Sequence, residues 1–179
     1  MDIKEKKIDS EIVFKGKLLE VHKDNILLPN QQRAIREYIN KIAASCIIAI
    51  KDDGKIILES QFRYPFNNAL IEFPAGKCDE GEDSSVTARR ELLEEAGYEA
   101  KNLEYLGKMY PSPAYTNEVI HLYLATNLIY KKQNLDENEF MNLFEVSEAQ
   151  LDEMILSGEI SDAKTICAWH LYKGKKKNV

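Results

Sequence analysis

Three glutamates in one short segment carry the clearest chemical signal in the sequence. Glu91, Glu94 and Glu95 stand at i, i+3 and i+4, so a helix would gather them within roughly 100° of arc. Like charges at this spacing repel, and the C-terminal end of a helix disfavours anions. Hard divalent cations bind clustered carboxylate oxygens, which would remove both costs. The segment predicts a metal site; the alternative is a solvated acidic helix face paired with Arg89 and Arg90.

The glutamates belong to a longer pattern of fixed spacing. Its fixed positions are Gly76, Glu82, Arg90, Glu91, Leu92, Glu94, Glu95, Gly97 and Tyr98. This spacing resembles the signature of the Nudix hydrolases, G-x5-E-x7-R-E-U-x-E-E-x-G-U, in which U is a bulky aliphatic residue. Tyr98 at the final U is a mild departure, because that position needs bulk more than branching.

The resemblance implies a fold, a reaction and a ligand set. The fold would be α/β, an α/β/α sandwich around a mixed sheet, and the reaction would be hydrolysis of a nucleoside diphosphate linked to another group. The implied ligands of Mg²⁺, with Mn²⁺ as an alternative, are Glu91, Glu94, Glu95 and the backbone carbonyl of Ala75. Arg90 would orient the glutamates and Glu82 would hold the loop, so Arg90 and Glu94 are also catalytic candidates.

Residues outside this signature resemble the ADP-ribose pyrophosphatase subgroup. The matching segments are Gln61-Phe62-Arg63, Ile71 to Gly76, Arg36-Glu37, Pro113, Asp136 to Phe140 and Asp162 to Thr165. The resemblance implies that Arg63 reaches the substrate phosphates, that Arg36 and Glu37 contact the adenine, and that Pro113 belongs to the substrate-binding loop. Ala114 stands where the subgroup usually has Gly. The implied reaction converts ADP-ribose to AMP and ribose 5-phosphate.

The proton of the attacking water needs a base other than the metal-binding glutamates. Glu139 is the first candidate, since it lies in the segment that resembles the subgroup's acidic loop; Glu137 is the second and Glu118 the third. Two alternatives stay open for the whole chain. It could hydrolyse a different nucleoside diphosphate derivative, or bind ADP-ribose without turnover.

Simpler explanations exist for the residues outside the signature. Arg63 could be a surface charge on an edge strand, and Arg36 and Glu37 a cross-strand surface pair. Glu137 and Glu139 could be solvated loop acids.

Apolar patterning predicts the elements that must position these residues. The stretch 84–96 has helical spacing and ends at Gly97, with Val86, Leu92, Leu93 and Ala96 opposite the glutamates. The other predicted elements are strands at 43–50, 55–60, 69–73, 103–109, 119–125 and 140–146, and helices at 147–156 and 161–172. The basic segment 173–177 is predicted to be a solvated, frayed end.

The N-terminal region predicts a separate small sheet. Residues 12–38 read as two or three antiparallel strands, which cannot bury both faces alone. We therefore divide the chain into an N-terminal sheet region, 1–40, and a catalytic domain, 41–179. In the resembling subgroup this sheet is exchanged within a homodimer. A partner would then cover Ile12, Val13, Phe14, Leu18, Leu19, Val21, Ile26, Leu27 and Leu28; the alternative is a monomer.

Composition limits the partners. The 179 residues carry a net charge of −6, which disfavours binding to nucleic acid through its phosphates. No segment is apolar for long enough to cross a membrane, and the charged N-terminus does not resemble a signal peptide. Three scattered cysteines predict neither a disulfide framework nor a zinc site. The expected location is the cytoplasm.

Overall fold

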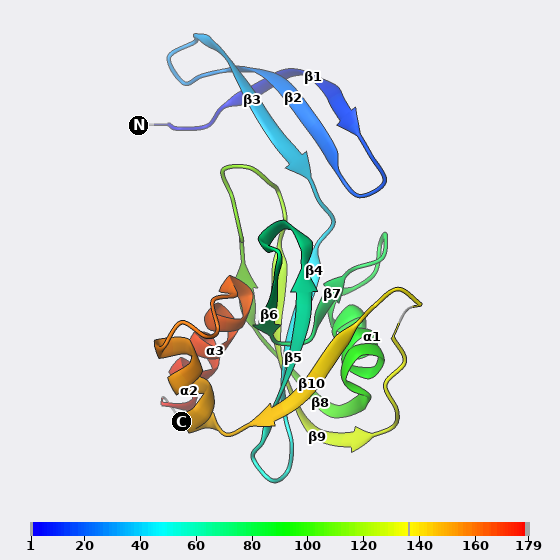
Figure 1. Ribbon diagram of the computed structural model, residues 1–179. Coiled ribbons are helices and arrows are strands. Elements are labelled where there is room, and N and C mark those ends of the chain that lie inside the picture. Colours follow the sequence, from blue (N-terminus) through cyan, green and yellow to red (C-terminus); the bar gives the residue numbers. More distant parts are fainter. Residues whose placement is uncertain (1, 136, 178–179) are drawn as a thin grey trace. The chain divides into compact units, whose positions relative to one another are not determined.

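The computed structural model describes residues 2–135 and 137–177. Asp136, part of the acidic loop named above, lies outside the described residues. The chain forms two compact units: the first comprises 1–42 and 112–118, and the second comprises 43–111 and 119–179 (Figure 1).

The first unit is a three-stranded antiparallel sheet. Strands β1 (Lys6–Lys15), β2 (Glu20–Leu27) and β3 (Arg33–Asn40) pair in the order β1-β2-β3. The segment 112–118 joins this unit because the Ile39 amide donates to the Tyr115 carbonyl oxygen at 2.8 Å. The antiparallel strands predicted for this region are confirmed.

The second unit is built on a seven-stranded mixed sheet. Its strands are β4 (Ala44–Ile50), β5 (Ile56–Arg63), β6 (Asn68–Glu72), β7 (Ala75–Lys77), β8 (Tyr98–Met109), β9 (Ile120–Tyr130) and β10 (Met141–Val146). The order is β10-β5-β4-β9-β8, with β6 paired to β5 and β7 to β4. The β4–β9 pair is parallel and the other pairs are antiparallel.

Helices cover both faces of this sheet. Helix α1 (Ser84–Ala96) lies on one face, and α2 (Glu148–Leu156) and α3 (Ala163–Lys176) lie on the other (Figure 1). A short 3₁₀ turn, η1 (Tyr64–Phe66), follows β5. This arrangement confirms the predicted α/β/α sandwich.

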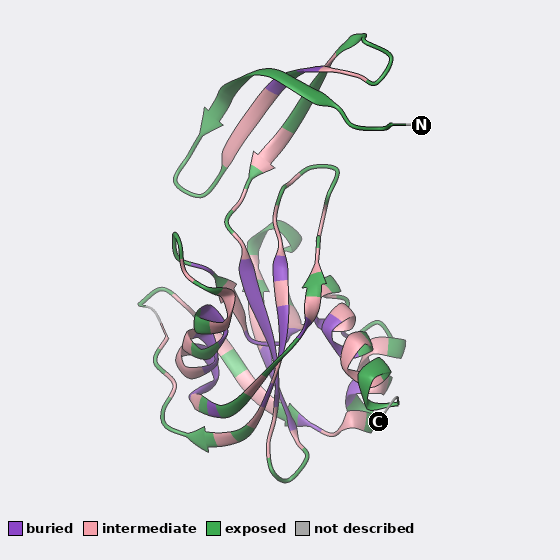
Figure 2. Cartoon of the chain, turned by 180° about the vertical axis from the view of Figure 1, so that it is seen from behind, coloured by how far each residue is buried: buried purple, intermediate pink, exposed green. Residues whose placement is uncertain are grey.

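Alternation along β4 divides the core into two clusters. Cys46 and Ile48 pack on the side of α2 and α3, whereas Ile47 and Ala49 pack on the side of α1. All four residues are fully buried, and buried residues gather along the central strands β4, β5 and β9 (Figure 2). A strand buried on both faces reads as a continuous apolar run, as predicted for this segment.

Some element boundaries differ from the prediction. Strands β8 and β9 extend well beyond the predicted 103–109 and 119–125, because they continue to pair with each other as far as Tyr98 and Tyr130. Their added residues are mixed in polarity, so no clean alternation marks them. Strand β7 and turn η1 were not predicted, since three residues are too few to show a period.

The C-terminal helix also differs at both ends. Its N-cap is Asp162, whose side chain accepts from the Thr165 amide at 2.9 Å, so the helix begins after the predicted Ser161. The predicted fraying from 173 was wrong, because α3 continues to Lys176, whereas residues 174–177 are exposed to solvent as predicted. Lys173 pairs with Asp152 at 3.0 Å on α2, which holds the last turns in place.

No helix among residues 2–135 and 137–177 is long and apolar enough to cross a membrane.

Candidate active site

Helix α1 and the loop before it carry most of the candidate site. Asp83 caps the start of α1 by accepting from the Ser85 amide at 2.8 Å. Gly97 ends the helix with a positive φ of 75°, and its amide donates to carbonyl oxygens of the last turn. The two caps fix the length of the helix, so the glutamates occupy its C-terminal half.

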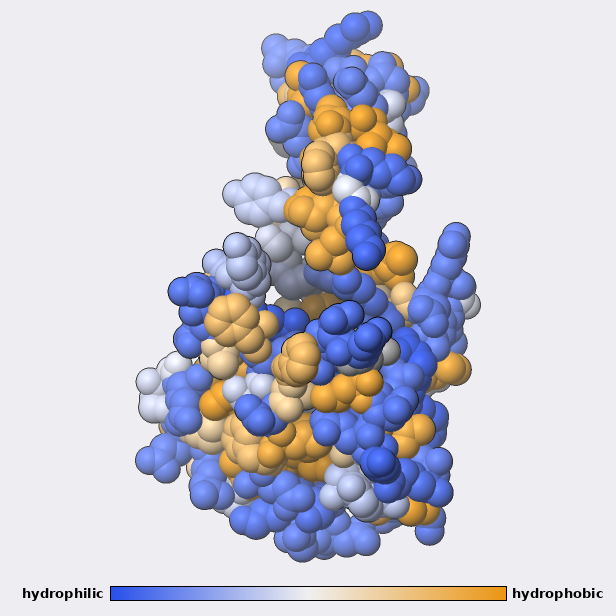
Figure 3. Space-filling view, turned by 45° about the vertical axis from the view of Figure 1, so that its right-hand side comes forward, coloured by the Kyte–Doolittle hydropathy of each residue, from blue (hydrophilic) through white to orange (hydrophobic). Residues whose placement is uncertain are grey.

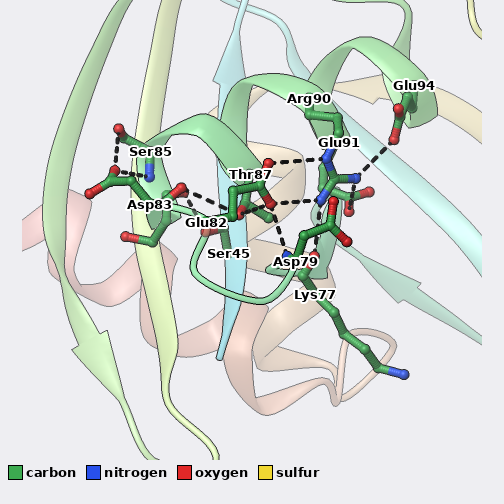
Figure 4. Close-up of polar contacts among 11 residues, drawn as sticks. Ser45, Lys77, Asp79, Glu82, Asp83, Ser85, Thr87, Arg90, Glu91 and Glu94 are labelled. Carbon is green, nitrogen blue, oxygen red and sulfur yellow. Dashed lines mark hydrogen bonds and ion pairs between the residues drawn. The ribbon is translucent and has the colours of Figure 1, made fainter. Parts of the chain in front are cut away.

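Arg90 ties the helix to its preceding loop. Its Nη1 donates to Glu91 Oε1 at 2.7 Å and to Glu94 Oε2 at 3.0 Å, and its Nη2 donates to Glu82 Oε2 at 3.1 Å (Figure 4). Nη2 also donates to the backbone oxygen of Lys77 at 3.0 Å. Hydrogen bonding to Arg90 lowers the pKa of Glu82 to about 2. One guanidinium thus bonds to three carboxylates, and the orienting role of Arg90 stays a prediction.

Two of the helix glutamates are buried. Glu95 is 3% exposed and Glu91 is 9% exposed, so the alternative of a solvated acidic face is wrong for these two. Burial raises the pKa of both carboxyl groups, with neighbouring carboxylates adding to the effect. Glu95 Oε2 accepts a hydrogen bond from the Ala75 amide at 2.8 Å. The predicted apolar side needs a correction: the buried face of α1 carries Glu91 and Glu95 together with Leu92 and Ala96, whereas Val86 lies off this face and is 53% exposed.

Strand β7 packs directly against the Glu91 carboxylate. A Cβ added at Gly76 would lie 1.9 Å from Glu91 Cδ, a distance that no side chain tolerates. Only glycine at position 76 therefore lets the Glu91 carboxylate lie against the strand. This explains why the sequence pattern begins with a glycine.

A cavity of ≈ 380 Å³ brings together most of the predicted residues of the second unit. It is lined by Gln61, Arg63, Ala75, Gly76, Lys77, Asp79, Arg90, Glu91, Glu94, Glu95 and Glu139. A second cavity of ≈ 700 Å³ is lined by Gln61, Phe62, Glu137, Asn138, Glu139 and Phe140. Glu139 lines both cavities, whereas Glu137 lines only the second.

Arg63 is fixed by a partner on the neighbouring strand. Its Nε and Nη2 each donate to a different oxygen of Glu72, both at 2.7 Å, which is a bidentate pair. Lys164, at the start of α3, also pairs with Glu72. Glu72 is 1% exposed, so a buried carboxylate holds both cations. The motifs that resemble the subgroup contain Glu72 and Lys164 but did not assign them this role.

Four candidates lie in the first unit. Arg36 pairs with Glu5, and Glu37 is exposed next to it on β3; consecutive strand residues point to opposite faces. Pro113 lies in a turn in which the Tyr115 amide donates to the Ser112 carbonyl oxygen at 2.9 Å. Glu118 ends the same segment. The roles of Arg36, Glu37, Pro113 and Glu118 stay predictions.

The donor set of the cavity fits a hard divalent cation. Carboxylate oxygens and a backbone carbonyl are the ligands that such ions prefer. Within 2–135 and 137–177, no three Asp, Glu, His or Cys side chains already converge as a metal site. The carboxylates instead bond to Arg90 and to the Ala75 amide.

Comparisons with known proteins agree with this geometry. The model of the NUDIX domain family matches residues 40–169. The chain belongs to this family. It is 39% identical to the ADP-ribose pyrophosphatase of Bacillus subtilis (strain 168), over 93% of this chain and 91% of that protein. It is 41% identical to the methanol dehydrogenase activator of Bacillus methanolicus, over 92% of this chain and 90% of that protein.

A solved structure shows the same fold. The crystal structure of an ADP compounds hydrolase superposes with a TM-score of 0.87, at 24% identity, and covers 98% of this chain and 95% of that one. This Nudix chain therefore shares its fold with a structure whose sequence has diverged widely.

Proposed function

We propose that this Nudix protein hydrolyses the pyrophosphate of ADP-ribose, or of a related ADP-sugar, to AMP and ribose 5-phosphate. The observation that carries the proposal is a single cavity lined by the helix glutamates, Arg63, Arg90 and Glu139. The same cavity therefore contains carboxylates that can bind a cation and guanidinium groups that can bind phosphate. The relative at 39% identity is named ADP-ribose pyrophosphatase, which supports the choice of substrate.

A divalent cation is part of this proposal. Glu91, Glu94 and Glu95 and the carbonyl of Ala75 would hold it, with Mg²⁺ as the proposed ion and Mn²⁺ as an alternative. The bound ion would neutralise phosphate charge and lower the pKa of a coordinated water.

The protein's own groups would position the reactants. Arg63 is held rigidly by Glu72 and would bind the substrate phosphates through the cavity it lines. Arg90 would keep Glu91 and Glu94 oriented, since it bonds to both. Glu139 would accept the proton of the attacking water, because it lines the same cavity.

The N-terminal region, 1–40, would complete the site in a homodimer. Arg36 and Glu37 would contact the adenine, Pro113 would shape the substrate-binding loop, and residues 41–179 would form the catalytic domain.

Exposed apolar surface supports the dimer. All ten residues of β1 are exposed, and apolar side chains gather on the surface of the first unit (Figures 2 and 3). The exposed apolar residues include Ile12, Val13, Phe14, Leu18 and Leu19. Of the residues expected to be covered by a partner, Ile26 is corrected: it is 4% exposed and is already buried within this chain.

The proposed location is the cytoplasm, with no nucleic-acid or membrane partner. The three cysteines are all unpaired, which agrees with a reducing compartment.

A substrate panel tests the proposed function. The full-length protein is incubated with Mg²⁺ and ADP-ribose, other ADP-sugars, GDP-sugars or oxidised nucleotides, and the products are resolved by chromatography. We expect AMP and ribose 5-phosphate from ADP-ribose at the highest kcat/KM. Faster hydrolysis of a GDP-sugar would contradict the substrate assignment, and ADP-ribose binding without any product would indicate a non-catalytic domain.

A further inference from the structure

Glu59 is a buried carboxylate to which the sequence pattern assigns no role. It lies on β5, is 1% exposed, and neither of its carboxylate oxygens has a hydrogen-bond partner among the described residues. Buried carboxylates are normally paired or bound to metal, because an unpaired buried charge is strongly unfavourable. The position of Glu59 therefore needs an explanation.

The strand places Glu59 on the side of the sheet that carries the candidate site. Ile57, two residues earlier on β5, packs in the core cluster beneath α1, and side chains two apart share a face. The cross-strand neighbours of Glu59 are Leu143 on β10 and Glu72 on β6. Leu143 packs against the same cluster beneath α1. Glu59 thus lies between the sheet and α1.

The two cations whose charges act on Glu59, Lys164 and Arg63, pair directly with other acids. Lys164 pairs with Glu72 and, at 3.2 Å, with Asp162. Arg63 makes its bidentate pair with Glu72. Neither cation donates a hydrogen bond to Glu59; burial raises the pKa of its carboxyl group, and Lys164 and Arg63 oppose this only through their charge.

The charge of Glu59 acts on the helix glutamates. After burial itself, the Glu59 carboxylate is the strongest of the groups that raise the pKa of Glu95. Glu139, which lines the cavity, is among the charges acting on Glu59. Glu59 does not line the cavity of the helix glutamates itself, but Gln61, two residues later on the same face of β5, does.

We propose that Glu59 is an additional ligand of the divalent cation, contributed by β5, beyond the glutamates of the Nudix signature. The inference rests on the proposed function, since it needs a cation at Glu91, Glu94 and Glu95. Two unpartnered carboxylate oxygens are free to bind a hard cation, whereas the oxygens of Glu72 are held by ion pairs. The competing explanation is a protonated carboxylic acid that only fills space.

Electron paramagnetic resonance separates the two explanations. It measures Mn²⁺ binding to the full-length protein in the absence of nucleotide. We expect Glu59→Gln, which keeps the shape and removes the charge, to weaken Mn²⁺ binding at least tenfold. The metal-free variant should melt at the same temperature as the wild type or higher, because a buried charge is lost. The matched control is Glu104→Gln, which removes an exposed carboxylate of β8 and should leave the affinity unchanged.

The outcomes distinguish this inference from the function on which it rests. Equal Mn²⁺ affinity in the wild type and Glu59→Gln would overturn the role of Glu59 and leave the metal site intact. A wild type that binds no Mn²⁺ would overturn both. Glu59→Leu provides a second variant with an apolar side chain and should show the same loss of affinity.

A wild-type crystal soaked in Mn²⁺ tests the inference without any substitution. We expect a Glu59 oxygen within about 2.5 Å of an anomalous scattering peak, as oxygen ligands of divalent cations require. A peak at the helix glutamates with Glu59 outside ligand distance would refute the proposal.

Discussion

The contact between Gly76 and Glu91 shows how one missing side chain shapes the site. Glu91 Oε1 lies 1.9 Å from the position that a Cβ would take, so any side chain at 76 must displace the carboxylate. We expect Gly76→Ala to lower kcat by about 10²-fold, because the new methyl group must push the Glu91 carboxylate aside and a displacement of about 1 Å can have this cost in catalysis. Steady-state kinetics with ADP-ribose measure it.

Gly174→Ala is the control for this substitution, because an added Cβ there has no atom of the described residues within 4 Å. Unchanged kcat in Gly76→Ala would mean that the position of Glu91 is unimportant for turnover.

The base is tested by comparing three residues. Glu139 lines the cavity of the helix glutamates, Glu137 lines only the neighbouring cavity, and Glu118 belongs to the first unit. We expect Glu139→Gln to reduce kcat the most, by about 10²–10⁴-fold, as loss of a general base does. Measured kcat values for the three single Gln variants decide the assignment, and a loss confined to Glu118→Gln would reject it.

Residue-scale prediction worked where chemistry imposes a spacing. The interval from Gly76 to Tyr98 identified the family. Arg63, Arg90 and Glu139 line one cavity, and their catalytic roles stay predictions. Glu59 was missed because a single carboxylate in a strand has no periodic partner. Its burial and its unpartnered oxygens emerge only when β5, β6 and α1 are packed together.

At the scale of elements, the end of α1 depends on Gly97. Its φ of +75° disfavours L side chains, and a Cβ would also lie 2.7 Å from the backbone nitrogen of Gln133. We expect Gly97→Ala to lower the free energy of unfolding by more than the roughly 1–2 kcal/mol typical of a left-handed non-glycine residue. Urea denaturation measures this difference.

Gly158→Ala separates the strain of the positive φ from the contact with Gln133. Gly158 also has a positive φ, of +81°, but no atom of the described residues lies within 4 Å of its Cβ position. The smaller loss is expected there. Equal losses in the two variants would show that the contact with Gln133 contributes nothing.

Element prediction was accurate where hydrophobic patterns are long and failed at their ends. The helix at 84–96 and the buried strand β4 have full periods and clear boundaries. The ends of β8 and β9 depend on their mutual pairing, and the last turns of α3 depend on ion pairs with α2. Such contacts join residues distant in sequence, so local patterns do not contain them.

At the scale of the whole molecule, the proposed dimer depends on the exposed strand β1. Ile12 is 50% exposed and Phe14 54% exposed, and burying side chains of this size is worth about 1.5–3 kcal/mol each. We expect the double variant Ile12→Asp, Phe14→Asp to sediment as a monomer and to bind ADP-ribose more weakly. Sedimentation velocity and a binding isotherm measure both effects.

Ile3→Asp serves as the control, because Ile3 is 82% exposed and lies outside the strands. A wild-type protein that sediments as a monomer while hydrolysing ADP-ribose at a normal rate would contradict the dimer.

The central claim is that the buried glutamates of α1 drive hydrolysis of ADP-ribose, and the kcat of Glu95→Gln at saturating Mg²⁺ tests it most directly. The variant should fold normally, because it removes one charge from a repelling cluster. We predict that kcat falls by at least about 10²-fold, because the loss of one electrostatic contact with the transition state has an effect of this size. A similar loss is expected for Glu91→Gln. A near-normal kcat in a folded Glu95→Gln protein would contradict the account.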